Sequence, residues 1–117
     1  NMPALNILGK LHWRAGRYEE AEAAFKKAIE ADIAGRNSRG FHRMLALLNL
    51  DLGSNQEAFA HMKKAIELPA AGGNDKIIKT DEILYQIFED FKDRKPISYT
   101  QSEGEELAEI IRLLRGF

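Results

Sequence analysis

Residues 16–21 of the chain read GRYEEA, and residues 53–58 read GSNQEA, so the same turn glycine and the same closing Glu-Ala occur twice. The correspondence continues, because residues 28–30 and residues 65–67 both read AIE at the same spacing of 37 residues. A fixed period of roughly 20–50 residues is typical of stacked structural repeats, in which each unit packs only against its neighbours. Such arrays usually present extended binding surfaces, so the duplication favours a binding protein over a catalyst.

Composition places the chain among ordinary globular proteins and excludes several functional classes. The 117 residues are 44% hydrophobic and 30% charged, which is enough apolar material for one small domain with its own core. A formal net charge of −1 argues against bulk attraction to nucleic acid or to an anionic membrane. The absence of cysteine excludes disulfides and thiol chemistry. No apolar run approaches the roughly 18–20 residues that span a bilayer, so we expect a soluble protein, with a cytoplasmic location favoured.

Hydrophobic periodicity and helix-stop signals predict an all-α chain. Gly16 and Gly53 each follow an apolar-periodic segment, at the position where a left-handed residue ends a helix. Pro69 ends another segment, and no segment alternates strictly enough to predict a strand. We expect about six helices, over residues 3–15, 18–33, 40–52, 55–68, 75–91 and from about 100–102 to 116.

Each predicted helix carries an apolar stripe at helical spacing. In the helices over residues 18–33 and 40–52, the expected buried residues are Ala21, Phe25, Ala28, Ile29, Leu45, Leu48 and Leu52. The helix over residues 75–91 has a wide apolar face made of Ile77, Ile78, Ile83, Leu84, Ile87, Phe88 and Phe91. On the first helix, Leu5, Leu8, Leu11 and His12 form one stripe, and Asn6, Lys10, Trp13 and Arg14 form the opposite one.

These residues resemble the tetratricopeptide repeat family, whose unit of about 34 residues follows the pattern W-x2-L-G-x2-Y…A-x3-F…P. In the first copy Leu8, Gly9, Ala21 and Phe25 match the pattern, whereas Leu5 replaces the Trp, His12 replaces the Tyr and the closing proline is missing. The second copy keeps Leu45, Ala46, Ala58 and a nearby Pro69, with His42 in place of the Trp and Met62 in place of the Phe.

The resemblance implies a fold and a domain organisation. The expected fold is a right-handed superhelix of antiparallel helix pairs, with two repeats over residues 2–35 and 39–69 inside the unit 1–69. Residues 70–117 lack the repeat signature and are expected to form a divergent third helix pair or a C-terminal cap within the same single domain. The period of 37 exceeds the family length, and the excess falls in the loop over residues 35–39.

In proteins similar to this one, the first helix of each repeat lines a concave groove. Carried over to this sequence, the peptide-binding candidates are Asn6, Lys10, Trp13, Arg14, Arg43, Met44, Leu47, Leu50 and Asp51. Basic groups beside an aromatic anchor suit a peptide with acidic and apolar side chains. Two alternatives stay open: Trp13 and Leu50 pack between the repeats, and the basic residues are solvated or paired locally.

Nothing in the sequence indicates catalytic, cofactor or metal chemistry. None of the three histidines, His12, His42 and His61, has a second ligand at helical spacing i+3 or i+4, so a zinc site is not expected. Carboxylates gather at helix starts, where the helix dipole already accounts for them. Some relatives clamp a C-terminal carboxylate of chaperones with lysine, asparagine and arginine at set groove positions. Here Asn6 and Lys10 stand in swapped order, so a carboxylate clamp of that type is not expected.

The sequence therefore predicts a non-enzymatic scaffold or adaptor that binds a protein or peptide, without a cofactor, nucleic acid or membrane insertion. A homo-oligomerisation module, with a homodimer formed through an apolar end, is one alternative. The other is an accessory domain of a larger protein, which includes the case of a larger enzyme. Asn1 ahead of Met2 suggests a scar left after tag removal, and we expect a domain excised from a longer protein because the chain enters a helix almost at once.

Overall fold

The computed structural model describes residues 2–70 and 75–92, together with residues 105, 109 and 112. Its helices are α1 (Met2–Arg14), α2 (Tyr18–Ala31), α3 (Ser38–Asp51), α4 (Asn55–Glu67) and α5 (Asp75–Phe91). These described residues contain no strand, so the all-α prediction is confirmed. Within the same residues, every helix is too short or too polar to cross a lipid bilayer.

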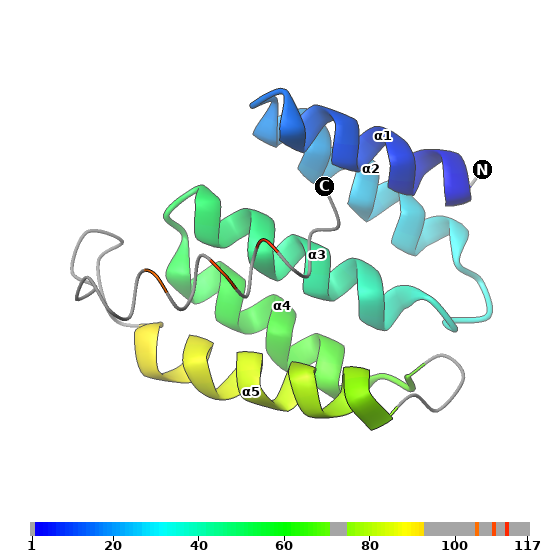
Figure 1. Ribbon diagram of the computed structural model, residues 1–117. Helices are drawn as coiled ribbons and strands as arrows, with labels where there is room; N and C mark the ends of the chain where they lie inside the picture. Colours follow the sequence, from blue (N-terminus) through cyan, green and yellow to red (C-terminus); the bar gives the residue numbers. More distant parts are fainter. Residues whose placement is uncertain (1, 71–74, 93–104, 106–108, 110–111, 113–117) are drawn as a thin grey trace.

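The five helices stack in the order of the chain (Figure 1). Helices α1 and α2 form one antiparallel pair, α3 and α4 form the next, and α5 follows at the opposite end from α1. Between the pairs, α2 packs against α3, and α4 packs against α5. Among the described helices, the main contacts thus join units that are neighbours in sequence, as the 37-residue period predicts.

The duplicated glycines end the first helix of each pair in the same way. Gly16 has φ 80° and Gly53 has φ 79°, in the left-handed region that favours glycine. The amide of Gly16 donates to the carbonyl of Trp13, and the amide of Gly53 donates to the carbonyl of Leu50, the equivalent residue 37 positions later. The sequence repeat is therefore a repeat of backbone geometry.

Small residues bring the two helices of the first pair into close contact. Ala21, Phe25 and Ala28 on α2 are fully buried, as the sequence predicts, and Gly9 of α1 lies directly against the Phe25 ring. A Cβ atom at Gly9 would stand only 2.8 Å from Cε1 and Cζ of that ring. The second pair uses Ala46, Ala58, Met62 and Ala65 at the equivalent positions, and all four are fully buried.

The structure corrects the predicted boundary between α2 and α3. Helix α2 ends at Ala31 instead of Ile33, and α3 begins at Ser38 instead of Gly40. The cause is the carboxylate of Asp32, whose Oδ2 accepts hydrogen bonds from the Asn37 amide and the Ser38 hydroxyl, each at 2.8 Å. Burial alone would raise the pKa of Asp32, but these hydrogen bonds outweigh it and lower that pKa below its ordinary value. A charged acceptor therefore fixes the start of α3 two residues early.

Some residues that the apolar stripes place in the core lie at the surface. Leu8 is 44% exposed and Leu11 is 53% exposed, whereas Leu45 and Leu48, their equivalents in α3, are fully buried as predicted. The prediction is also wrong for Leu52, Ile77 and Ile83, which are 41%, 40% and 57% exposed. The buried positions on α5 are Asp81, Leu84 and Phe88.

The predicted sixth helix falls mostly outside the described residues. Glu105, Glu109 and Arg112 are described and are helical, and Arg112 binds Glu109 one turn away, which is a surface pair. The side chain of Phe91, predicted to be apolar and inward, also lies outside the described part of the chain.

A pair of glycine substitutions tests the close helix contact. We expect Gly9→Ala to destabilise the fold by about 1–3 kcal/mol, because the new methyl group overlaps the buried Phe25 ring. Gly40→Ala is the matched control, since its Cβ would meet nothing closer than Nη1 of Arg43 at 3.8 Å and should stabilise α3 by up to about 0.5–1 kcal/mol. Urea unfolding monitored by circular dichroism measures both. Equal effects of the two substitutions would contradict the packing described for Gly9.

Candidate functional site between the first helices of the two repeats

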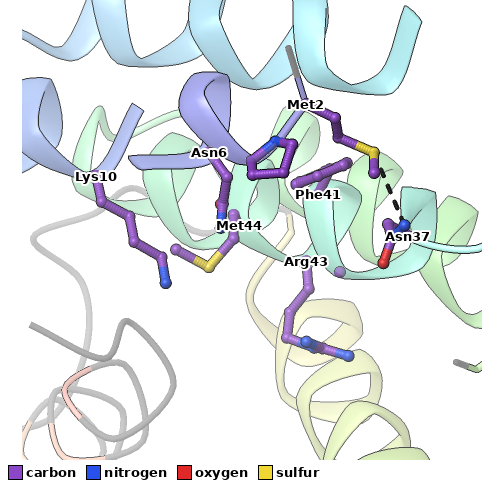
Figure 2. A pocket seen from close by; sticks show the side chains of 9 residues that line it. Met2, Asn6, Lys10, Asn37, Phe41, Arg43 and Met44 are labelled. Carbon is purple, nitrogen blue, oxygen red and sulfur yellow. Dashed lines mark hydrogen bonds between the residues drawn. The ribbon is translucent and has the colours of Figure 1, made fainter. Parts of the chain in front are cut away.

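An open pocket of about 400 Å³ lies between α1 and the N-terminal half of α3. This volume falls within the range of small-molecule and side-chain binding sites. Figure 2 shows side chains from both helices converging on it, and the pocket is lined by Met2, Pro3, Asn6, Lys10, Asn37, Gly40, Phe41, Arg43 and Met44. Its wall is therefore built by the first helix of each repeat, the surface that the family resemblance assigns to binding.

The structure brings four of the predicted groove residues together at this pocket: Asn6, Lys10, Arg43 and Met44. Gly40 and Phe41 also line the pocket but were not among the predicted groove residues, although both lie inside the helix predicted over residues 40–52. Both lie within one helical turn of Met44 once α3 begins at Ser38. Met2 and Pro3 were also missed, although Pro3 was placed correctly in the first turn of α1.

Trp13 is a structural residue that joins the two repeats. Its side chain is only 2% exposed, and its ring stacks edge-to-face on Phe25 with ring centroids 6.4 Å apart. The indole Nε1 donates to Oδ2 of Asp51 at 2.7 Å, which links the end of α1 to the end of α3. The alternative that Trp13 packs between the repeats is therefore the arrangement that the structure shows.

Three further candidates lie away from the pocket. Leu47 is fully buried and so presents no surface, because the whole middle turn of α3 is covered by its neighbours. Leu50 is partly buried and packs against the core. Arg14 is exposed at the C-terminal end of α1, outside the residues that line the pocket.

Arg43 belongs to an ion-pair cluster with α5. Its guanidinium makes two hydrogen bonds to the carboxylate of Asp81, through Nε and through Nη2, the latter at 2.9 Å from Oδ2. Arg39, one helical turn earlier, donates from Nε to the same Oδ2 at 2.9 Å and from Nη1 to the Leu68 carbonyl at 2.7 Å. The Asp81 side chain is fully buried, and the Arg39 side chain is 8% exposed. Arg43 is thus paired locally and extends toward α5, away from Lys10 (Figure 2).

The electrostatic character of the site is nevertheless positive. Arg39 and Arg43 share one carboxylate, which leaves one positive charge in excess. A smaller hollow of about 120 Å³ adjoins the pocket through Asn37, Gly40 and Arg43, and Arg36 and Arg39 also line it. Among the described residues that line the two hollows there is no Asp or Glu, while Lys10 makes no ion pair within the described part of the chain. Such a surface favours a partner that carries negative charge.

His42 of α3 and His61 of α4 face each other, and neither of them lines the pocket. Their Nδ1 atoms are 3.3 Å apart and their ring centroids are 5.5 Å apart, so one neutral ring donates its proton to the other. Burial, followed by the charges of His61 and Lys64, lowers the pKa of His42 to about 4. The described residues hold no group of three or more His, Cys, Asp or Glu side chains placed to bind a metal ion.

Removing the buried carboxylate tests the ion-pair cluster. We expect Asp81→Asn to destabilise the fold by about 3–5 kcal/mol, because two arginines would then lack their shared counter-charge. Asp90→Asn, an exposed position on the same helix, is the matched control and should change stability by less than about 0.5 kcal/mol. Chemical denaturation measures the free energy of unfolding of both variants. If Asp81→Asn lowered it no more than Asp90→Asn, the ion-pair cluster would not be what holds α5 in place.

The histidine pair predicts a pH dependence of stability. The unfolded chain takes up a proton at His42 near pH 6.5, whereas the folded chain resists this until about pH 4. Protonation therefore favours unfolding in this window, and the free energy of unfolding should fall as the pH is lowered from 7 to 4.5. After allowance for solvent screening, we expect a fall of about 1–2 kcal/mol.

His42→Gln should reduce that fall, and the remainder is expected from His61, whose pKa is also lowered by burial. Urea titrations at pH 7.0, 6.0, 5.0 and 4.5 measure it for both proteins. The charges of Glu57, Lys26 and Glu22 also affect the pKa of His61. The difference between the two stability profiles therefore reports on His42 more directly than either profile alone. Parallel profiles for the variant and the parent would contradict the assignment to His42.

Comparison with known proteins agrees with this architecture. A family model described as tetratricopeptide repeat matches residues 4–75, which span α1 to α4 and more than half of the chain. No curated protein and no solved structure gives a significant match. The matched segment includes both copies of the 37-residue pattern and both helix pairs. The chain belongs to the tetratricopeptide repeat family.

Proposed function

We propose that the chain is a binding module that holds an acidic, partly apolar segment of a partner protein in the pocket between α1 and α3. Tetratricopeptide repeats are generally non-catalytic and use their superhelical surfaces to bind other proteins. One observation carries the finer proposal: among the described residues, this pocket combines apolar side chains, of which Met2 and Pro3 reach the surface, with positive charge that no lining carboxylate neutralises.

The chemistry of the lining gives each side chain a role in recognition. Met2, Pro3, Phe41 and Met44 offer an apolar floor, and the thioethers adapt readily to side chains of different shape. Lys10 stands at the α1 edge of the pocket, where its ammonium group can pair with a partner carboxylate (Figure 2). Asn6 and Asn37 supply amide groups for backbone hydrogen bonds of the bound segment.

Helix packing prepares the pocket before any partner arrives. Trp13 and Asp51 fix the far ends of α1 and α3, and Asp81 fixes the direction of Arg43. A surface formed by such packed helices loses little conformational entropy on binding, which is the advantage of a preorganised site. Binding then depends on a small number of side chains at the centre of the pocket.

A charge reversal at Lys10 tests this proposal. Peptides are first selected against the parent chain from a phage-displayed library of unstructured 12-residue segments, and we expect selection to enrich Asp or Glu beside an apolar residue. Lys10→Glu should then weaken the selected peptides at least about tenfold, because attraction becomes repulsion at the pocket edge. Lys27→Glu, an exposed position on α2, should leave affinity within about twofold. Peptides that bind the parent and the Lys10 variant equally would contradict the proposed site.

A further inference from the structure

Three arginines line the smaller hollow that adjoins the pocket at the N-terminal end of α3. This arginine hollow has a volume of about 120 Å³, and its lining consists of Arg36, Asn37, Arg39, Gly40, Arg43, Ala70 and Ile77. None of these described residues is acidic. Recognition at the larger pocket relies on Lys10, so it leaves the function of this arginine cluster open.

The carboxylate of Asp81 uses only part of the hydrogen-bonding capacity of this cluster. It accepts from Nε of Arg39 and from Nε and Nη2 of Arg43, while Nη1 of Arg39 donates to a backbone carbonyl. Within the described part of the chain, Nη2 of Arg39 and Nη1 of Arg43 have no acceptor, and Arg36 makes no hydrogen bond or ion pair. The Nη1 atom of Arg43 lies beside Gly40, since a Cβ there would stand 3.8 Å from it. Donors therefore remain for a ligand in the arginine hollow.

Burial strengthens the positive charge of the arginine hollow. Three guanidinium groups and one carboxylate leave two positive charges in excess. The side chains of Arg39 and Arg43 are only 8% and 15% exposed, so solvent screens their charges weakly. Asp32 also lies at this end of α3, but it does not line the hollow, and its hydrogen bonds go to the first residues of that helix. Because Asp81 already holds two of the arginines in place, an anion would find donors whose directions are fixed in advance.

A phosphate monoester matches this arrangement better than a carboxylate does. At pH 7 a phosphorylated side chain carries about −1.5 to −2 charges and three strong acceptor oxygens, whereas a carboxylate has one charge and two oxygens. Guanidinium groups bind phosphate oxygens in pairs, and arginine clusters are a recurring means of recognising phosphorylated segments. A hollow of about 120 Å³ has the volume of about four water molecules, which suits one phosphoryl group and not a chain of them.

We propose that the arginine hollow binds the phosphate of a phosphoserine or phosphothreonine in the partner segment that occupies the larger pocket. This assignment rests on the proposed function, because Asn37, Gly40 and Arg43 line both cavities and one extended segment would reach across them. A nucleic acid fits less well, since the chain has a formal net charge of −1 and the excess positive charge is confined to one small hollow.

Matched peptides measure what the phosphate contributes. The probe is a library of 12-residue synthetic peptides with one fixed phosphoserine, which is selected on the full chain beside the same library with a fixed serine. Enriched peptides are then made with phosphoserine, serine or glutamate at the fixed position, and fluorescence anisotropy gives their affinities. We expect the phosphoserine form to bind at least about tenfold more tightly than the serine form and at least about threefold more tightly than the glutamate form.

Two arginine variants locate the phosphate. Arg36→Ala removes an exposed side chain that holds no other described group, so the variant should keep the parent circular dichroism spectrum and thermal midpoint. We expect it to reduce the gain from phosphorylation to below about threefold, and Arg36→Lys should restore part of that gain. Arg17→Ala is the matched control, since Arg17 is an exposed loop arginine outside both cavities, and it should leave the gain within about twofold of the parent value.

The outcomes distinguish a failure of the arginine hollow from a failure of the larger pocket. If the phosphoserine library gave no enrichment over the serine library, or if the gain survived Arg36→Ala, the phosphate assignment would be wrong, whereas acidic peptides that depend on Lys10 would still support the proposed function. A gain that Arg36→Ala removes, in peptides that Lys10→Glu does not weaken, would support the arginine hollow and contradict the proposed pocket.

Two further ligands test the choice of a peptide. The same anisotropy assay is run with a single-stranded 12-nucleotide DNA, and sedimentation is run with vesicles that contain a phosphoinositide. We expect both to bind at least about tenfold more weakly than the best phosphopeptide. Tighter binding of either one, lost in Arg36→Ala, would make a nucleic acid or a membrane lipid the ligand and overturn the phosphopeptide assignment.

Discussion

The buried carboxylate of Asp81 is the point at which the third helical unit is tied to the second. Two arginines one turn apart on α3 bind it, and one of them also binds the carbonyl of Leu68 at the end of α4. A buried charge is strongly destabilising without such partners, so the positions of α3, α4 and α5 are coupled through this one group. The same interaction turns Arg43 away from Lys10, and so it decides which cation of the pocket is available to a partner.

Much of the fold follows from the amino-acid pattern. The turn glycines, the small residues at helix contacts and the 37-residue period predict two helix pairs, and all of these features appear in the structure. The start of α3 was not predictable from local pattern, because it depends on a carboxylate five residues earlier in the chain that accepts the Asn37 amide. Gly40 and Phe41 lie inside the predicted helix, but local pattern did not assign them to the pocket that they line.

The candidate site was harder to derive than the fold because its chemistry comes from contacts between distant residues. Tryptophan is a residue type that often anchors a binding surface, yet the indole N–H of Trp13 donates to Asp51 and its ring packs against Phe25. Arg43 resembles a free groove cation until Asp81, 38 positions away, is placed beside it. The only local signal was an aspartate on the stripe that Leu84 and Phe88 continue, since a charge among buried apolar residues implies a buried partner. Equivalence between repeats predicts packing, whereas the proposed binding surface uses residues at which the two repeats differ.

Amide chemical shifts give the most direct test of the central claim that the pocket between α1 and α3 is the binding surface. An ¹⁵N-labelled sample of the full chain is titrated with a peptide selected for acidic and apolar side chains. We expect the largest shift changes at Asn6, Lys10, Gly40, Phe41 and Met44, with smaller changes on α2 and α4. Changes concentrated on the outer faces of α2 and α4, with none at the pocket, would contradict it.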